Sequence, residues 1–433
     1  MPKDPSDHGA DVLIIGAGAA GLAAAVMAAE QHRESRIVLL EGTSRPGSKL
    51  LLTGGRRCNL TNRTVTPQDF SGSNPHAIKK VLGAFTVTQT IEFFRSLGVL
   101  LHEEEGGKLF PQHGGAHAVR NALLGRVESS GLKILTRQKV KRIEQSSNAF
   151  VVSTSESTFT APRILLTTGG CSYPSTGSDG SGYELARSCG HTIIPPTPAL
   201  VPLVLAGGFH RGLIGISHDV ELTLVVDGKR VKTAGSLLWT HFGVSGPAVL
   251  DISGHWLRGK LEGLRVEVTV NLLPGETAAS LEQWLIRLAS NHPRMSFHRA
   301  LSSRMPARLA EAVLHGLDVD GTTAMAHLSR DTRRHVRSAL VAWPLPVVDS
   351  RGYEHAEVTA GGVPLKEVNP ATMESRICPG LFLAGEVLDV TGRVGGFNLQ
   401  WAWSSAWVAA RGLTVDNAAL PRAEVSAHSG RHH

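Results

Sequence analysis

The residues with the clearest chemical purpose are three glycines near the N-terminus. Gly16, Gly18 and Gly21 form the spacing G-x-G-x-x-G, after a short apolar run at residues 12–15 and before an alanine-rich segment. When a strand precedes and a helix follows, the first glycine allows a tight turn, the second lets the backbone approach a pyrophosphate, and the third lets helix and strand pack closely. The N-terminus of the helix then faces the negative charge of the ligand. The spacing therefore predicts a dinucleotide-binding site.

An acidic residue supports the same interpretation. A second apolar run, at residues 36–40, ends in Glu41, twenty residues after Gly21. A carboxylate in this position accepts hydrogen bonds from the hydroxyls of the adenosine ribose, and it would repel an adenosine 2′-phosphate. The sequence therefore predicts that the dinucleotide is NAD or FAD rather than NADP.

The composition is that of an ordinary globular protein. The chain has 433 residues, of which 42% are hydrophobic and 19% are charged, enough for two or three domains. The four cysteines form no C-x-x-C pair, so they predict reduced thiols and no metal site. Residues 12–29 carry no charge over about the length of a membrane helix. The glycines within this stretch and the acidic residues before it favour a strand, a turn and a helix instead. We expect a soluble, cytoplasmic protein without membrane contact.

The formal net charge is +7. The excess is scattered, but arginines enrich one region, which predicts a solvated helical face and, as the alternative, a contact for an anionic ligand or nucleic acid. These arginines are Arg294, Arg299, Arg304, Arg308, Arg330, Arg333, Arg334 and Arg337.

Residues 42–62 carry a longer signature. Their sequence, GTSRPGSKLLLTGGRRCNLTN, resembles the segment of the HI0933-like flavoproteins in which a glycine-rich stretch leads into G-R-C-N-x-T-N. Residues 355–413 are similar to the same family nearly throughout. The resemblance implies an FAD-dependent oxidoreductase that binds FAD non-covalently, with residues 47–62 along the pyrophosphate and the ribityl chain. Arg56 stands where the family commonly has a glycine.

The element pattern and the resemblance together imply an α/β fold. We expect a Rossmann-like FAD-binding domain of the glutathione-reductase type, with an inserted β-barrel plus helical domain. Within the insert, residues 200–275 predict strands and residues 277–341 predict helices; residues 75–100 predict a helix outside it. The predicted boundaries are a disordered tail at 1–10, the FAD-binding domain at 11–193 and 351–413, the insert at 194–350, and a second disordered tail at 414–433.

The C-terminal segment supplies the flavin end of the predicted site. By the resemblance, residues 379–386 form the last strand of the fold and its cofactor loop, and residues 395–398 precede a helix. The N-terminus of that helix would stabilise negative charge on the reduced flavin and so raise its reduction potential. The predicted cofactor-binding residues are Gly16, Gly18, Ala19, Ala20, Gly21, Glu41, Gly47, Lys49, Arg57, Cys58, Asn59, Val140, Thr168, Gly169, Gly170, Gly385, Glu386, Gly395, Gly396, Phe397 and Asn398.

Catalysis requires an acid or a base near the flavin N5, where hydride or electrons are transferred. The candidates are His241, Arg57 and Tyr173, because all three lie in segments that resemble cofactor-side loops of the family. For His241 the alternative is a hydrogen bond that orders its loop. We interpret Cys58 as a flavin-contacting or packing thiol rather than a nucleophile, since no paired base is evident.

Three functions remain open from the sequence. The first is an FAD-dependent reductase of C=C bonds, with NADH or NADPH as external reductant. The second is an FAD oxidase that uses O2 as acceptor and acts on an amine or an aromatic heterocycle. The third is a nucleic-acid-associated flavoprotein in which the basic insert binds RNA. The sequence favours a small-molecule substrate over nucleic acid and does not determine the oligomeric state.

Overall fold

The computed structural model describes residues 7–146 and 149–413. Its central element is a five-stranded parallel sheet with the order β22-β12-β2-β3-β8. The strands β2, β3 and β22 are buried throughout, as expected for aliphatic strands in a sheet covered on both faces. Their bounds are β2 (Val12–Ile15), β3 (Ile37–Leu40), β8 (Lys133–Leu135), β12 (Arg163–Leu166) and β22 (Leu381–Leu383).

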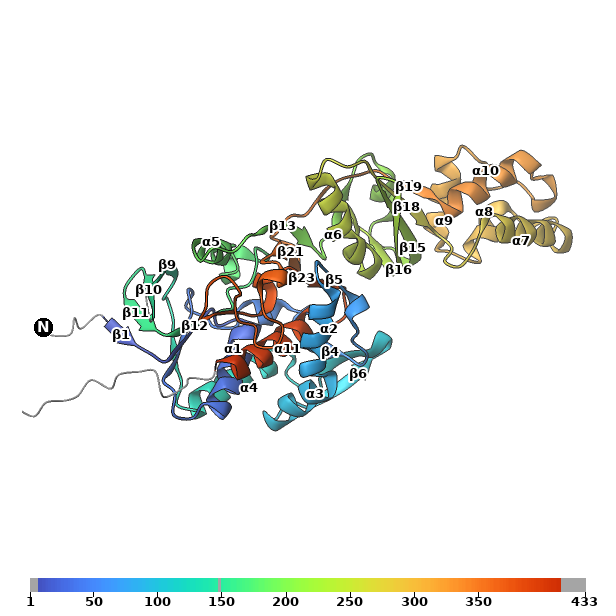
Figure 1. The fold of residues 1–433 in the computed structure, drawn as a ribbon. Helices are drawn as coiled ribbons and strands as arrows, with labels where there is room; N and C mark the ends of the chain where they lie inside the picture. The colour runs from blue at the N-terminus through green and yellow to red at the C-terminus, as the bar shows by residue number, and fades with distance from the viewer. Residues whose placement is uncertain (1–6, 147–148, 414–433) are drawn as a thin grey trace, which may run out of the picture.

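The two ends of the described chain meet beside this sheet. The alanine-rich helix α1 (Ala19–Gln31) packs against the C-terminal helix α11 (Phe397–Gly412) and against α4 (Gly115–Ser129) (Figure 1). Small side chains on α1 allow this close approach, and α1 is buried from Ala20 to Ala28. The first and last segments of the fold therefore build one layer.

A second, mixed sheet flanks the parallel sheet. Its order is β1-β11-β10-β9, where β1 is Asp7–Gly9, β9 is Val140–Gln145, β10 is Phe150–Thr154 and β11 is Thr158–Ala161. The pairing is antiparallel except between β1 and β11. Residues 7–9 were predicted to belong to a disordered tail. Instead they pair in parallel with β11, which gives their backbone groups hydrogen-bond partners.

Smaller elements complete this part of the molecule. The predicted helix at residues 75–100 is two helices, because Thr86 and Gln89 form a capping box that starts the second one. These elements are α2 (Pro75–Ala84), α3 (Val87–Ser96), α5 (Ser181–Ser188), β4 (Thr61–Asn62), β5 (Phe70–Gly72), β6 (Leu101–Glu104), β7 (Lys108–Pro111), β13 (Ile194–Ala199), β21 (Val358–Gly362) and β23 (Val390–Gly392).

Residues 194–350, which we call the insert, contain a seven-stranded antiparallel sheet with the order β19-β18-β15-β16-β17-β14-β20. Only Pro346 separates β19 from β20, yet these strands lie at opposite edges of the sheet. One bent segment thus pairs with both edges and closes the sheet into a barrel. The strands are β14 (Leu203–Leu205), β15 (Ser217–Val226), β16 (Lys229–Trp239), β17 (Gly243–Ser245), β18 (Val266–Asn271), β19 (Trp343–Leu345) and β20 (Val347–Ser350).

The helices of the insert lie in two places. Helix α6 (Pro247–Leu261) packs on β13, β15 and β16. The others form the end of the molecule farthest from the parallel sheet (Figure 1). They are α7 (Ala278–Asn291), α8 (Phe297–Ser302), α9 (Ala307–Gly316) and α10 (Arg330–Val341).

Two large hydrophobic cores correspond to these two parts. One draws on residues 12–186 and 363–413, and the other on residues 203–345. The antiparallel pair β13–β21 runs between them. We call the part around the first core the dinucleotide-binding lobe. The exact domain boundaries given above remain predictions.

Candidate functional site

A cavity of about 580 Å³ lies at the carboxyl edge of the parallel sheet. It is lined by residues that directly follow four of the strands: Gly16 after β2, Glu41 after β3, Thr167 after β12 and Gly385 close after β22. Open α/β sheets bind their ligands at this edge. The fold therefore places a ligand site where the sequence motif predicts one.

The three motif glycines have different surroundings. A Cβ atom on Gly16, whose φ is +103°, would lie 2.6 Å from the carbonyl oxygen of Thr167. A Cβ atom on Gly21 would overlap the carbonyl oxygen of Gly16, so this glycine allows helix α1 to pack on its own strand. A Cβ atom on Gly18 would meet nothing within 4 Å, because Gly18 faces the cavity. Gly18 is the position that leaves room for a ligand.

The N-terminus of α1 is open toward the cavity. No side chain caps it, and its first turn contains no acidic residue. Exposed amide groups and the positive end of the helix dipole favour a pyrophosphate there. Glu41 lies beside this helix end, where its carboxylate accepts hydrogen bonds from the amide of Ala17 (3.0 Å) and the amide of Thr43 (2.7 Å). These groups suit the adenosine end of a dinucleotide.

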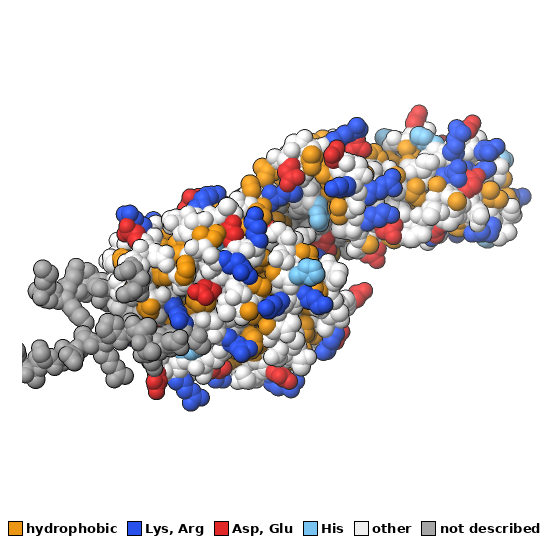
Figure 2. Space-filling view, in the orientation of Figure 1, with side chains coloured by type: hydrophobic (Ala, Val, Ile, Leu, Met, Phe, Trp, Pro, Cys, Tyr) orange, Lys and Arg blue, Asp and Glu red, His pale blue; other side chains and the backbone are white. Residues whose placement is uncertain are grey.

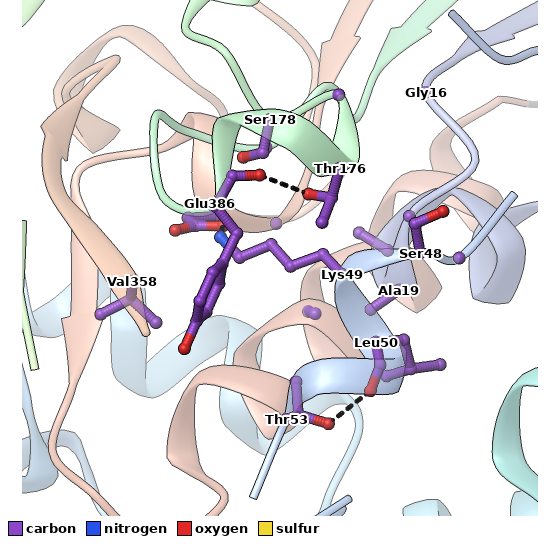
Figure 3. Close-up of a pocket in the computed structure, with 18 of the residues that line it drawn as sticks. Gly16, Ala19, Ser48, Lys49, Leu50, Thr53, Thr176, Ser178, Val358 and Glu386 are labelled. Carbon is purple, nitrogen blue, oxygen red and sulfur yellow. Dashed lines mark hydrogen bonds and ion pairs between the residues drawn. The ribbon is translucent and has the colours of Figure 1, made fainter. Parts of the chain in front are cut away.

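An ion pair crosses the middle of the cavity. Lys49, from the 3-10 helix η1 (Lys49–Leu52), places its Nζ 2.6 Å from Oε2 of Glu386. Figure 3 shows the Lys49 side chain extended across the site toward Glu386, with Ser178 and Thr176 above it. Oε1 of Glu386 also accepts a hydrogen bond of 2.8 Å from the amide of Thr359. The ion pair therefore keeps the ammonium group of Lys49 at the wall of the cavity, between the N-termini of α1 and α11.

The signature loop adopts an unusual backbone. Arg56 (φ +71°) and Cys58 (φ +59°) both have left-handed conformations. The glycine that the family commonly has at position 56 would suit such a φ, so the arginine preserves the loop geometry. Cys58 is buried, and burial raises the pKa of its thiol to about 12. A protonated thiol is a poor nucleophile, which agrees with the packing role expected for Cys58.

Helix α11 begins at the other end of the cavity. Gly395 and Gly396, with φ +132° and +93°, precede it, and a Cβ atom on Gly396 would lie 2.6 Å from the carbonyl of Thr61. Asn398 fixes the approach to the helix, since its side chain exchanges two hydrogen bonds of 2.8 Å with the backbone of Gly392. The helix N-terminus therefore points its amides toward the cavity.

The residues present fit FAD. The cavity joins an uncapped helix N-terminus that suits a pyrophosphate, a carboxylate that suits ribose hydroxyls, and a second helix N-terminus. It is also lined by Thr168, Gly169 and Ser178, from the segment that follows β12.

Most predicted cofactor residues come together here. Those that line the cavity are Gly16, Gly18, Ala19, Ala20, Glu41, Gly47, Lys49, Arg57, Asn59, Val140, Thr168, Gly169, Gly385, Glu386, Gly395, Gly396 and Asn398. Four others do not line it: Gly21 packs α1 on its strand, Gly170 packs on Thr359, and Cys58 and Phe397 are buried in the protein interior.

The three catalytic candidates are distributed differently. Arg57 and Tyr173 line the cavity, whereas His241 does not. His241 is an exposed residue of the insert, and its ring lies against Phe242. The structure therefore offers His241 no contact with the cavity, and its catalytic role remains a prediction.

Cations gather at the end of the cavity near α11. Arg57 lies over the ring of Phe110 (4.3 Å to its centroid) and Arg393 over the ring of Phe397 (4.2 Å). Both line the cavity together with Lys108. Arg393 and Lys108 were missed by the sequence analysis, because no motif marks them.

Glu357 was missed as well. Its side chain is exposed and lines the cavity, and its carboxyl group has no hydrogen-bond or ion-pair partner among the described residues. The surrounding protein and the nearby Asp251 carboxylate raise the pKa of Glu357, and Lys49 opposes them. Asp251 belongs to α6 and accepts a 2.6 Å hydrogen bond from the amide of Val394. Glu357 lies within the family-like C-terminal stretch, but only its unpaired position in the cavity singles it out.

Comparisons with known proteins agree with this site. The model of the HI0933-like protein Rossmann domain matches residues 10–412. The chain belongs to the HI0933-like family. It is an FAD-dependent oxidoreductase, so the family resemblance and the FAD cofactor expected from the sequence are confirmed.

Two curated relatives match at the same level. A ribosomal RNA dihydrouridine synthase of Escherichia coli is 35% identical over 410 residues, covering 93% of this chain and 98% of that protein. A 3-dehydro-bile acid delta(4,6)-reductase of Clostridium scindens is 35% identical over 400 residues, covering 92% of this chain and 97% of that protein.

Solved structures support the fold. The FrdA chain of quinol fumarate reductase from E. coli matches with a TM-score of 0.50 at 15% identity, over 94% of this chain and 70% of that chain. A 3-ketosteroid delta1-dehydrogenase from Sterolibacterium denitrificans also gives 0.50, at 12% identity, over 94% and 99% of the two chains. The Rossmann-like fold class with its insert is thus confirmed. Among the described residues, no helix is long and apolar enough to span a membrane.

Proposed function

We propose that this enzyme reduces a carbon–carbon double bond conjugated to a carbonyl group. The proposal is carried by the bond chemistry that its two equally similar relatives share. One is named for the reduction of 3-dehydro-bile acid double bonds, and the other for the synthesis of dihydrouridine. A 3-oxo steroid diene and a uracil ring both contain C=C conjugated to C=O. Reduction of the C=C bond next to the carbonyl adds a hydride to the β carbon and a proton to the α carbon.

The geometry of the cavity supports this reaction. Bound FAD supplies a hydride at its N5 when reduced. Arg57, Lys108 and Arg393 line the end of the cavity where α11 begins. Cationic donors there can bind the carbonyl oxygen and stabilise the negative charge that develops on it after hydride addition. Stacking on Phe110 and Phe397 holds the two guanidinium groups in place.

NADH or NADPH is proposed as the external reductant, because the sequence contains one G-x-G-x-x-G motif and the FAD occupies it. We also propose a cytoplasmic location, which suits the absence of any disulfide among the four cysteines. The alternative is an oxidase that returns electrons to O2.

A uridine in RNA is the second candidate substrate, although the sequence favoured a small molecule. Two observations favour it: the relatives include rRNA dihydrouridine synthases, and three cations, Arg57, Lys108 and Arg393, line the cavity. Arg57 and Arg393 also pair with Glu104 and Asp69, so Lys108 is the cation that we expect to contact phosphate. A small enone and a uridine share the reacting bond, so the choice depends on what surrounds it.

One set of anaerobic measurements tests the proposal. Photoreduced holoenzyme is mixed with a steroid dienone, with unmodified rRNA, or with air-saturated buffer, and reoxidation of the flavin is followed by its visible absorbance. We expect one of the two C=C acceptors to reoxidise the flavin faster than oxygen does. The product should contain two additional hydrogen atoms by mass spectrometry. Reoxidation by oxygen within seconds, with neither acceptor reduced, would show an oxidase instead.

The same assay separates the two substrates. Reduction of rRNA should slow steeply as salt rises, because phosphate contacts release counterions. Lys108→Gln should slow the reduction of rRNA at a given salt concentration. Arg330→Gln changes an exposed residue of the distal helices, and it should leave that rate unchanged. Reduction of a steroid dienone should be nearly independent of salt.

A further inference from the structure

Glu357 is exposed and is one of the residues that line the cavity. Glu357 directly precedes β21, and Figure 3 shows its neighbour Val358 across the cavity from Gly16. Only its backbone is anchored, since its amide donates a hydrogen bond of 3.1 Å to the carbonyl of Leu200. An exposed carboxyl group that lines a cavity and has no partner among the described residues is free to contact what the cavity binds.

Charged and titratable groups from three elements face this carboxyl. Asp251 lies on α6, Lys49 on η1, and Tyr173 in the loop that precedes the 3-10 helix η4 (Pro174–Thr176). Asp251 and the surrounding protein favour the protonated form of Glu357, and the Lys49 ammonium, engaged with Glu386, only partly offsets them. Glu357 is therefore suited to carry a proton at a pH where an ordinary glutamate has lost it.

We propose that Glu357 is a catalytic residue that donates a proton to the α carbon of the substrate double bond. This inference rests on the proposed function. Tyr173 is the competing donor in the same part of the cavity, and it is held in a left-handed backbone conformation (φ +53°). The phenol is the weaker candidate. Burial and Glu357 raise its pKa above the ordinary value of 10, and a general acid works best when its pKa lies near the working pH.

The step balances in atoms and electrons. Bound reduced FAD would supply the hydride and its two electrons to the β carbon, and the external NADH or NADPH would reduce the FAD again. The O–H bond of Glu357 breaks as a C–H bond forms at the α carbon, and the two electrons of the former double bond complete that new bond. The resulting carboxylate regains a proton from solvent before the next turnover.

The test compares three variants of the holoenzyme under argon. Glu357→Gln should retain bound FAD, reduction by NADPH and turnover with ferricyanide, which accepts electrons without a proton on carbon. Its reduction of the C=C acceptor should fall about 100-fold. Glu354→Gln changes an exposed glutamate of the same loop that does not line the cavity, and it should behave as wild type. Tyr173→Phe should lose less of this C=C reduction than Glu357→Gln does, and the opposite order would make Tyr173 the proton donor.

A nitroalkene acceptor separates hydride transfer from protonation, because the nitronate formed by hydride addition persists in water. Wild type should release the nitroalkane. Glu357→Gln should reoxidise its flavin at a similar rate but release the nitronate, which is detected by its absorbance. If Glu357 only supported the fold, Glu357→Gln would release the nitroalkane, as wild type does.

Three outcomes would overturn the assignment. Retained C=C reduction in Glu357→Gln would show that another group supplies the proton. Loss of FAD or of NADPH reduction would show that Glu357 holds the cofactor instead. If wild type itself reduced no C=C acceptor while turning over ferricyanide, the proposed function would fail, and the acid role with it.

Discussion

At the scale of single residues, Gly18 and Gly21 belong to one motif but perform separable tasks. A methyl group at Gly18 has free space and an ordinary backbone (φ −79°), whereas one at Gly21 overlaps the backbone of Gly16. Gly18→Ala should therefore fold like wild type and bind FAD at least about 10-fold more weakly, since the methyl group occupies the space for the pyrophosphate. Fluorescence titration of the deflavinated protein with FAD measures this loss.

Gly21→Ala is the matched comparison. It should lower the free energy of unfolding by about 3 kcal/mol or more, because the helix must move off its strand. Urea unfolding of the two variants checks the contrast. Equal losses of stability in both would contradict the division of tasks.

At the scale of elements, the contact between α6 and the loop before α11 joins the insert to the flavin end of the cavity. It depends on the hydrogen bond from the amide of Val394 to Asp251, and burial raises the pKa of Asp251 to about 6 from 3.8. The folded state thus holds this proton more tightly than the unfolded state. Stability is lost as the pH rises from about 4 to about 6 and is not regained above it.

Asp251→Asn should remove that loss. The asparagine oxygen can still accept the Val394 hydrogen bond, and no charge needs to be buried. The variant should match wild type near pH 4 and exceed it by roughly 2 kcal/mol near pH 8. Urea unfolding at the two pH values measures the difference. A variant less stable than wild type at both would show that the carboxylate itself holds the two elements together.

At the scale of the whole molecule, the two hydrophobic cores predict two unfolding events. The site for FAD lies in the dinucleotide-binding lobe, so FAD at 100 times its Kd should stabilise that lobe by about 2.7 kcal/mol and leave the insert unchanged. Trp401, Trp403 and Trp407 report on the lobe, and the other four tryptophans report on the insert. A thermal scan should show two transitions, of which FAD shifts one. A single transition would indicate one cooperative unit.

The position of the arginine-rich region in the whole molecule explains its excess of positive charge. The arginine-rich region lies in the distal helices of the insert (Figure 1), and on the face shown in Figure 2 many of its cations stand beside acidic side chains. Arg304 pairs with Glu276, and Arg333 and Arg337 pair with Glu282. This arrangement favours the solvated-face interpretation for that region.

The sequence alone determined the dinucleotide half of the site and the order of the main elements. The reason is local: Gly16, Gly18, Gly21 and Glu41 are close in the chain, and a strand, a turn and a helix suffice to aim them at one ligand. The structure, and not the sequence, shows that Arg56 adopts a left-handed backbone conformation at the position where the family commonly has a glycine. The sequence pattern was less reliable at the ends of elements. The helix expected at residues 75–100 is divided by a capping box at Thr86, and residues 7–9, expected in a disordered tail, pair with β11.

Only the tertiary structure decided the catalytic half. Glu357, Asp251, Arg393 and Lys108 come from four separate segments, and no spacing relates them. Asp251 reaches the flavin end because α6 of the insert packs against the loop before α11, while His241, in a family-like segment, is turned to the surface. Side chains from distant parts of a chain become neighbours through the packing of whole layers, and the pKa of a carboxyl depends on those neighbours. A motif can therefore predict where the cofactor binds, whereas the position of a carboxyl group beside it depends on how distant segments pack together.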